Sequence, residues 1–219
     1  MIKYVPQLIN LFATLILMLS FAMISQRRIT SLINLFMLQG AALVATSVLL
    51  GYFSKQNDLY VSAGLTLLLK VILIPWMLHR VIRRLNVRWD IETMINIPTT
   101  MLVGIALVIF SFSLALPISK LSTSVAGSSL GIALACVLLS FMMMITRSKA
   151  VPQVIGFLSM ENGLIFAATA VTNGMPMIVE FGVALDVLVG VLILGVFIFQ
   201  IREKFDSLDI HNLEALKED

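Results

Sequence analysis

The chain has 219 residues, of which 59% are hydrophobic and only 12% are charged, and its mean hydropathy is +1.03. This composition excludes an ordinary soluble domain and indicates an integral membrane protein. The net charge of +3 gives no reason to expect a nucleic-acid partner. The single cysteine, Cys136, offers neither a disulfide framework nor a set of metal ligands.

Seven segments are apolar and long enough to cross a bilayer, because a helix of about 20 residues spans the hydrocarbon core. They cover residues 6–25, 32–53, 59–79, 98–117, 124–145, 150–172 and 177–200. Continuous apolar runs of this length exclude a β-barrel, whose strands are short and alternate in polarity. The sequence therefore predicts an all-α integral membrane protein, a single domain of seven transmembrane helices.

The basic residues predict the orientation of these helices. One set of loops, with the C-terminal tail, contains eleven of them: Arg27, Arg28, Arg80, Arg83, Arg84, Arg88, Arg147, Lys149, Arg202, Lys204 and Lys217. The opposite loops contain Lys3, Lys55 and Lys120. Because positive charge is retained on the cytoplasmic side, we expect the N-terminus outside and the C-terminus in the cytoplasm. The membrane is expected to be the inner (cytoplasmic) membrane of the cell.

Several polar residues interrupt the second and third apolar segments. Asn34 and Gln39 are expected to form hydrogen bonds between helices. Pro75 removes a backbone hydrogen bond and is expected to kink the third helix. His79 lies at the membrane edge, where a lone histidine is more often structural than a proton carrier. The loop over residues 79–92 is either a snorkelling membrane anchor or a docking surface for a cytoplasmic partner.

The second half of the chain repeats features of the first. A basic turn precedes both the second and the sixth helix, and both the third and the seventh helix carry a charge in mid-span. Residues 1–97 and 124–200 are therefore possible parallel repeats, with the helix at 98–117 as a bridge. The four residues 173–176 are too few to join the last two helices except as an antiparallel hairpin. Residues 201–219 form the cytoplasmic tail.

Three ionisable residues lie inside apolar segments: Lys70, Glu161 and Asp186. At 1.5 Å per residue, each lies about 14–16 Å from the outer end of its helix, near the bilayer midplane. Each charge there costs about 2.5–3.5 kcal/mol unless it is paired, hydrated or neutralised. A purely structural ion pair would use Lys70 and one carboxylate, and the second carboxylate would have no partner in that pair. A proton relay would use all three, with Gln39, Asn162 and His79 as supporting polar groups.

The segment VIGFLSMENG at residues 154–163, the step from Asp186 to Gly190, and the tail DSLDIHNLEALKED together resemble the hydrogenase-4 component E family. That family is the membrane subunit of formate hydrogenlyase-type, energy-converting hydrogenases. The last three helices, residues 124–200, also resemble subunit K of respiratory complex I. That subunit carries one glutamate in its second helix and one in its third, both associated with proton translocation.

The match to subunit K is uneven between the two acids. Asp186 lies where the third-helix glutamate of subunit K would lie. Around the second-helix glutamate, the pair 155–156 and Asn162 fit the pattern, but Leu158 stands at the position of the acid. Glu161 follows three residues later, about one turn along the same face. The resemblance therefore carries a role to Glu161, not an identical position, while Lys70 is similar only to buried lysines of antiporter-like subunits.

The resemblance implies a membrane-arm subunit of a redox-driven, ion-translocating complex. Its partners would be antiporter-like membrane subunits, a hydrogenase-like or other cytoplasmic redox module, and the lipid bilayer. No cofactor is expected in this chain, because it has no cysteine cluster for an iron–sulfur centre and no histidine pair spaced for haem. Two alternatives stay open: a stand-alone cation transporter and a purely structural scaffold. Whether protons or sodium ions move also stays open.

Overall fold

The computed structural model describes residues 5–54, 57–85, 95–119 and 124–172, together with 182, 185–190 and 193. Almost all of these residues are helical, and six helices are long and apolar enough to cross a membrane. The described part of the chain thus confirms an all-helical, multi-pass membrane fold. Most of the predicted seventh span, 177–200, and the tail, 201–219, lie outside the described residues, although 185–190 is helical.

The first three spans begin with α1 (Val5–Ser25) and α2 (Ile29–Ser54). The third span consists of α3 (Asn57–Thr66), the π-helical segment η2 (Leu67–Leu73) and α4 (Ile74–Leu85). The remaining spans are α5 (Ile97–Ser119), α6 (Ser124–Thr146) and α7 (Ala150–Thr172). Most boundaries agree with the predicted segments to within a few residues. However, α5 does not end at Pro117 as expected but continues to Ser119.

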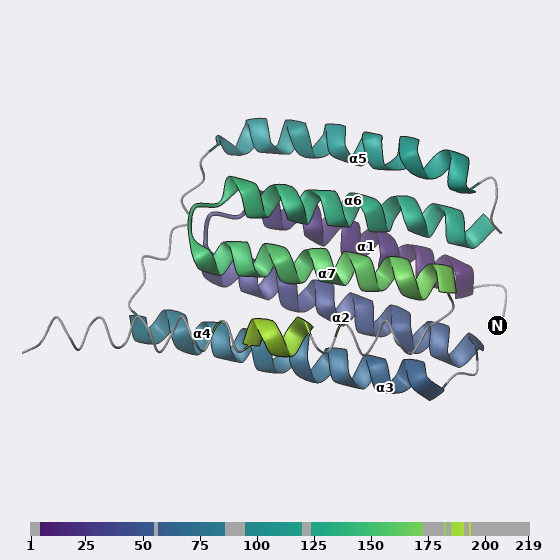
Figure 1. Cartoon of the computed structure of the whole chain (residues 1–219), viewed down its shortest axis with the longest axis horizontal. Helices are drawn as coiled ribbons and strands as arrows, with labels where there is room; N and C mark the ends of the chain where they lie inside the picture. The colour runs from purple at the N-terminus through teal and green to yellow at the C-terminus, as the bar shows by residue number, and fades with distance from the viewer. Residues whose placement is uncertain are drawn as a thin grey trace, which may run out of the picture.

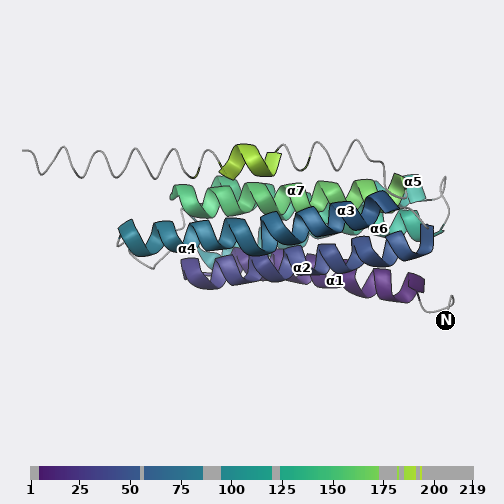
Figure 2. The same cartoon turned by 90° about the horizontal axis from the view of Figure 1, so that it is seen from below.

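The helices lie side by side along one common axis (Figure 1). Helix α6 packs against α5, α7 and α1, and α2 packs against α1, α7 and the third span. Helix α5 lies at one edge of this bundle and the third span at the opposite edge (Figures 1 and 2). Large apolar side chains fill the centre, including Phe36 and Phe166, which are fully buried. The outer face of α5 is also apolar, as expected for a helix in contact with lipid or another subunit.

Basic side chains gather at one end of the bundle. The α1–α2 turn, the end of α4 and the α6–α7 turn all lie at the end opposite the N-terminus (Figure 1). These segments contain every described lysine and arginine except Lys70. The charge asymmetry of the sequence therefore reappears as a basic end of the folded bundle, which we call the basic end.

The third span departs from α-helical geometry where the proline was expected to disturb it. The wide π-helical turn covers Leu67–Leu73, and the backbone N–H of Ile74 donates to the carbonyl of Leu69, five residues back. Pro75 has no N–H to donate to the residue four positions earlier, so regular hydrogen bonding cannot continue through this point. The irregular turn contains Lys70, which is fully buried. Such turns within α-helices are frequently found at functional sites.

Arg147, in the α6–α7 turn, is buried rather than solvated. Its Nη2 donates to the carbonyl oxygens of Ile24 at 2.6 Å and Met23 at 3.4 Å. Both carbonyls belong to the last turn of α1, where the helix dipole favours a cation. The guanidinium therefore holds the α6–α7 hairpin against the end of α1, and α1–α2 and α6–α7 meet at the basic end.

Candidate functional site

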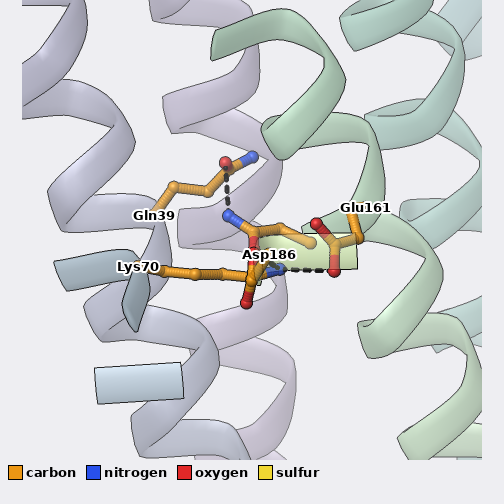
Figure 3. Close-up of polar contacts among 5 residues, drawn as sticks. Gln39, Lys70, Glu161 and Asp186 are labelled. Atoms are coloured by element: carbon orange, nitrogen blue, oxygen red, sulfur yellow. Dashed lines mark hydrogen bonds and ion pairs between the residues drawn. The ribbon is translucent and has the colours of Figure 1, made fainter. Parts of the chain in front are cut away.

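The three ionisable residues predicted at the membrane midplane come together in the folded chain (Figure 3). Lys70 Nζ lies 3.2 Å from Glu161 Oε1 and 3.5 Å from Asp186 Oδ1. Lys70 comes from η2, Glu161 from α7 and Asp186 from the helical segment 185–190. All three side chains are buried, with Lys70 at 0% exposure. One ammonium group thus contacts two carboxylates that belong to two different helices.

The ammonium group has a third partner. Lys70 Nζ donates a hydrogen bond of 3.0 Å to Asn162 Oδ1, so three oxygen atoms surround a group that has three N–H donors. The contacts with the two carboxylates are ion pairs by distance. Among the described residues, both oxygens of Glu161 and Oδ1 of Asp186 have no hydrogen-bond donor. Of these oxygens, Glu161 Oε2 takes part in neither ion pair.

The charges of this cluster do not balance when both carboxylates are ionised. One ammonium and two carboxylates give a net charge of −1 in a buried site, which is costly because the surroundings cannot solvate it. One proton shared by the two carboxylates makes the cluster neutral. Two acids this close titrate as a pair rather than as independent groups. The arrangement can therefore hold one exchangeable proton, with Lys70 paired to the carboxylate that lacks it.

A chain of amides and hydroxyls extends from the ion cluster into the bundle. Asn162 Nδ2 donates to Gln39 Oε1 at 3.1 Å (Figure 3). Gln39 Nε2 donates in turn to Ser20 Oγ at 2.8 Å and to Ser159 Oγ at 3.0 Å. Ser159 Oγ also shares a hydrogen bond of 2.7 Å with Ser140 Oγ. The chain links α1, α2, α6 and α7 to the third span through buried polar atoms.

These hydrogen bonds determine which way each amide points. The nitrogen of Gln39 is turned toward the two serine hydroxyls, so its oxygen is left to accept from Asn162. The nitrogen of Asn162 is thereby used, and its oxygen faces Lys70. This oxygen accepts a hydrogen bond from one of the three N–H groups of the ammonium. Gln39 and Asn162 therefore position Lys70 through a connected network, in which each bond supports the next.

Two glycines let the helices that carry these residues come close together. A Cβ on Gly40 would lie 3.3 Å from Val71 Cγ2 and 3.7 Å from Lys70 Cβ. Gly182, one turn before Asp186, would place a Cβ 3.5 Å from Glu161 Oε1 and 2.9 Å from Ile165 Cδ1. Small residues at these two positions thus allow α2 to approach η2, and residue 182 to approach α7.

The structure brings together five of the six residues singled out from the sequence. Glu161, Asp186 and Lys70 form the ion cluster, and Gln39 and Asn162 join it as supporting polar groups. His79 lies apart from them: its Nδ1 donates to the carbonyl of Pro75 at 2.8 Å, within its own helix. Asn34, expected to bond between helices, is exposed instead. The roles of all these residues in proton transfer stay predictions.

Sequence reasoning missed the serines of the network, Ser20, Ser140 and Ser159. Serine in an apolar helix usually bonds to its own backbone and gives little signal of a partner. Ser20 does so here, donating to the carbonyl of Ile16 at 2.9 Å while also accepting from Gln39. Among the described residues, no group of three or more His, Cys, Asp or Glu side chains could hold a metal ion.

Known proteins with a similar sequence cover almost the full chain. Hydrogenase-4 component E of Escherichia coli K12 is 21% identical over 210 residues, which is 96% of this chain and 97% of that protein. This chain is similar to hydrogenase-4 component E from end to end. The Shigella flexneri protein of the same name gives the same figures. These matches support the predicted family resemblance, whereas the resemblance to subunit K of complex I is a separate prediction.

A second relative is more similar in sequence. The Mycobacterium tuberculosis protein named "Uncharacterized protein Rv0085" is 29% identical over 212 residues, 96% of each chain. No protein-family model matches the chain, and no solved structure matches it. Each of these matches covers 96% of the chain, so the similarity includes every helix that contributes to the ion cluster.

Proposed function

We propose that this chain is a membrane-embedded subunit of a multisubunit complex that couples a redox reaction to ion movement. Its own contribution is a proton path through Lys70, Glu161 and Asp186. Support for the first part comes from the full-length similarity to a protein named as a component of a hydrogenase, and from the six candidate membrane spans. Support for the second comes from one observation: a single buried ammonium group between two carboxylates of different helices.

The geometry suggests how a proton would pass. When Glu161 takes up a proton, Lys70 pairs with the ionised Asp186; when Asp186 takes it up, Lys70 pairs with Glu161. The two contacts of Nζ differ by only 0.3 Å, from 3.2 Å to 3.5 Å, so this exchange needs a small movement of one flexible side chain. Asn162 stays bonded to the ammonium group throughout. The cluster remains neutral at each stage, which avoids the cost of a net buried charge.

The proposed subunit has no cofactor of its own and lies in the inner membrane with its basic end toward the cytoplasm. Antiporter-like membrane subunits would contact its apolar outer faces, and a hydrogenase-like or other redox module would lie on the cytoplasmic side. A relationship to subunit K of complex I, carried by Asp186 and Gly190, belongs to the same proposal. Function in such systems depends on the assembled partners rather than on the fold of one subunit.

The test is to replace each acid by its amide in the assembled complex. Glu161→Gln and Asp186→Asn remove charge but keep shape, so we expect assembly and redox turnover to persist while proton uptake by inverted membrane vesicles falls by tenfold or more. Asp58→Asn is the matched control, because Asp58 lies in the first turn of α3, far along the span from the cluster. Normal proton uptake in both amide variants would refute the relay.

Reconstitution, co-purification and the Glu161 variant distinguish the two alternatives. A stand-alone cation transporter would catalyse cation exchange in liposomes that contain the purified chain alone, and it would not co-purify with redox subunits. A scaffold would lose assembly, not coupling, when Glu161 is neutralised. Comparing uptake at fixed pH with and without sodium decides which ion moves.

A further inference from the structure

A groove on the outside of the bundle is not used by the proposed proton path. It lies between α2 and the third span and has a volume of about 650 Å³. Its lining residues come from both helices: Asn34, Met37, Val71, Ile72, Pro75, Trp76, His79, Arg80 and Arg83. The volume falls within the roughly 300–1,000 Å³ typical of ligand sites. The groove is therefore large enough to hold part of a molecule rather than a single water.

The groove changes in character along its length. Its inner part is apolar and is lined by Met37, Val71 and Ile72. Its outer part lies at the basic end, where Arg80 and Arg83 are exposed. The Arg80 guanidinium lies 5.3 Å from the centre of the Trp76 ring, and this contact holds the cation at the side of the groove. An apolar channel that ends in two cations matches a ligand with an apolar tail and an anionic head.

The length of the groove agrees with one leaflet of a membrane. From Val71 to Arg83 the third span rises by about 18 Å at 1.5 Å per residue. Half of a typical hydrocarbon core is about 15 Å. Trp76 is 60% exposed, and tryptophan is enriched near membrane surfaces. An acyl chain that begins at the arginines would thus reach the turn of Lys70, close to the bilayer midplane.

We propose that this groove binds an anionic phospholipid from the leaflet at the basic end. The phosphate would lie at Arg80 and Arg83, and an acyl chain would lie over Val71 and Ile72. Basic pockets between transmembrane helices on the cytoplasmic side are known to bind such head groups. A second protein helix would fill the apolar part, but it would not by itself explain two exposed cations at the mouth. The inference depends on the membrane location of the chain and not on the proton path.

Trp76 provides a direct probe, because the chain has only two tryptophans. Trp89→Phe leaves Trp76 as the only tryptophan in the full-length chain, and excitation at the red edge of its absorption selects it over the three tyrosines. The protein is reconstituted with brominated phosphatidylglycerol or brominated phosphatidylcholine, and quenching is compared at equal mole fractions. Each arginine near the surface contributes roughly a factor of five, so phosphatidylglycerol should bind roughly 5- to 30-fold more tightly. The preference is the ratio of quenching by phosphatidylglycerol to quenching by phosphatidylcholine within one variant. A substitution that changes the fluorescence intensity of Trp76 therefore does not change this ratio.

Two double variants test the site itself. Arg80→Gln with Arg83→Gln should abolish the preference for phosphatidylglycerol. Arg27→Gln with Arg28→Gln removes the same charge from exposed positions at the same end, and it should leave the preference unchanged. Equal quenching by both lipids, or an equal loss in the two double variants, would overturn the proposal. So would the absence of quenching by either brominated lipid, because no lipid would then reach the groove.

Discussion

Replacing Lys70 by methionine should have opposite effects on stability in two different backgrounds. In the unmodified chain, Lys70→Met leaves Glu161 and Asp186 buried without the one cation that contacts them among the described residues. In a chain that already carries Glu161→Gln and Asp186→Asn, Lys70 is itself the uncompensated buried charge. Removing it there should be neutral or stabilising. The sign of one substitution thus reports whether Lys70 acts through charge or through packing.

The distances give the size of the effect. At an effective dielectric constant of about 20, opposite unit charges 3.2 Å or 3.5 Å apart attract each other by about 5 kcal/mol, and one such pair is charged at a time in the neutral cluster. Desolvation of the charges offsets part of this attraction, and breaking a buried ion pair typically costs about 3–5 kcal/mol. We therefore expect Lys70→Met to lower the free energy of unfolding by about 3–5 kcal/mol. Glu161→Gln alone should cost about 1 kcal/mol, because Lys70 keeps Asp186 and Asn162 as partners.

The purified chain in detergent micelles can be unfolded with increasing dodecyl sulfate, and the folded fraction can be followed by the reactivity of its single cysteine. Cys136 is fully buried, so its thiol reports loss of the native packing of α6. Arg27→Met is the matched control, because it removes a cation from an exposed position. It should change the free energy of unfolding by less than about 0.5 kcal/mol.

The result that would refute this reasoning is an equal cost of Lys70→Met in both backgrounds. Equal costs would mean that the long side chain matters for filling space and not for its charge. A proton relay built on a shared ammonium group would then lose its physical basis. If Lys70→Met greatly lowers the free energy of unfolding of the unmodified chain but not that of the Glu161→Gln, Asp186→Asn chain, the ion cluster is supported.

The remaining predictions concern packing, a buried arginine and the cysteine. Gly40→Ala should destabilise the chain by about 1 kcal/mol, because its Cβ would press on the third span. A Cβ on Gly64 would meet no atom within 4 Å, so Gly64→Ala should be neutral or stabilising in the same unfolding titration. Equal effects of the two alanine substitutions would contradict the close approach of α2 to η2 at Gly40. Arg147→Gln should cost about 2 kcal/mol by releasing the end of α1, whereas the exposed Arg28→Gln should cost little. In native membranes, maleimide should label Cys136 only after denaturation, and rapid labelling would contradict its burial.

Local properties of the sequence determined the helices and the depth of their charges. Hydrophobic length places the spans, since a helix rises by a constant 1.5 Å per residue whatever lies beside it. The same arithmetic placed Lys70, Glu161 and Asp186 at one depth, and the structure brings them into contact. The gathering of basic residues at one end also followed from the sequence, because it needs only the alternation of the spans.

Only the tertiary structure decided which side of each helix faces which neighbour. Depth along a helix says nothing about rotation around it, so the sequence left open whether Lys70 met the two acids or another subunit. Pro75 signalled an irregular third span, but the π-helical turn that contains Lys70 depends on how the whole span packs. Arg147 is a similar case, because the sequence identified it only as one of the basic loop residues, whereas carbonyl oxygens at the end of α1 hold its guanidinium inside the bundle.

The polar network shows the same division between local and tertiary information. Asn162 and Gln39 could be recognised as polar residues in apolar helices, but their bond joins positions 123 residues apart. The serines that orient Gln39 gave no recognisable signal. His79, which the sequence placed at the membrane edge, bonds only within its own helix among the described contacts. Sequence pattern therefore determined which groups lie within the apolar helices and how far along each helix they lie. The packing of helices distant in the chain decided which of them meet, because hydrogen bonds and ion pairs require contact distances that only the assembled bundle provides.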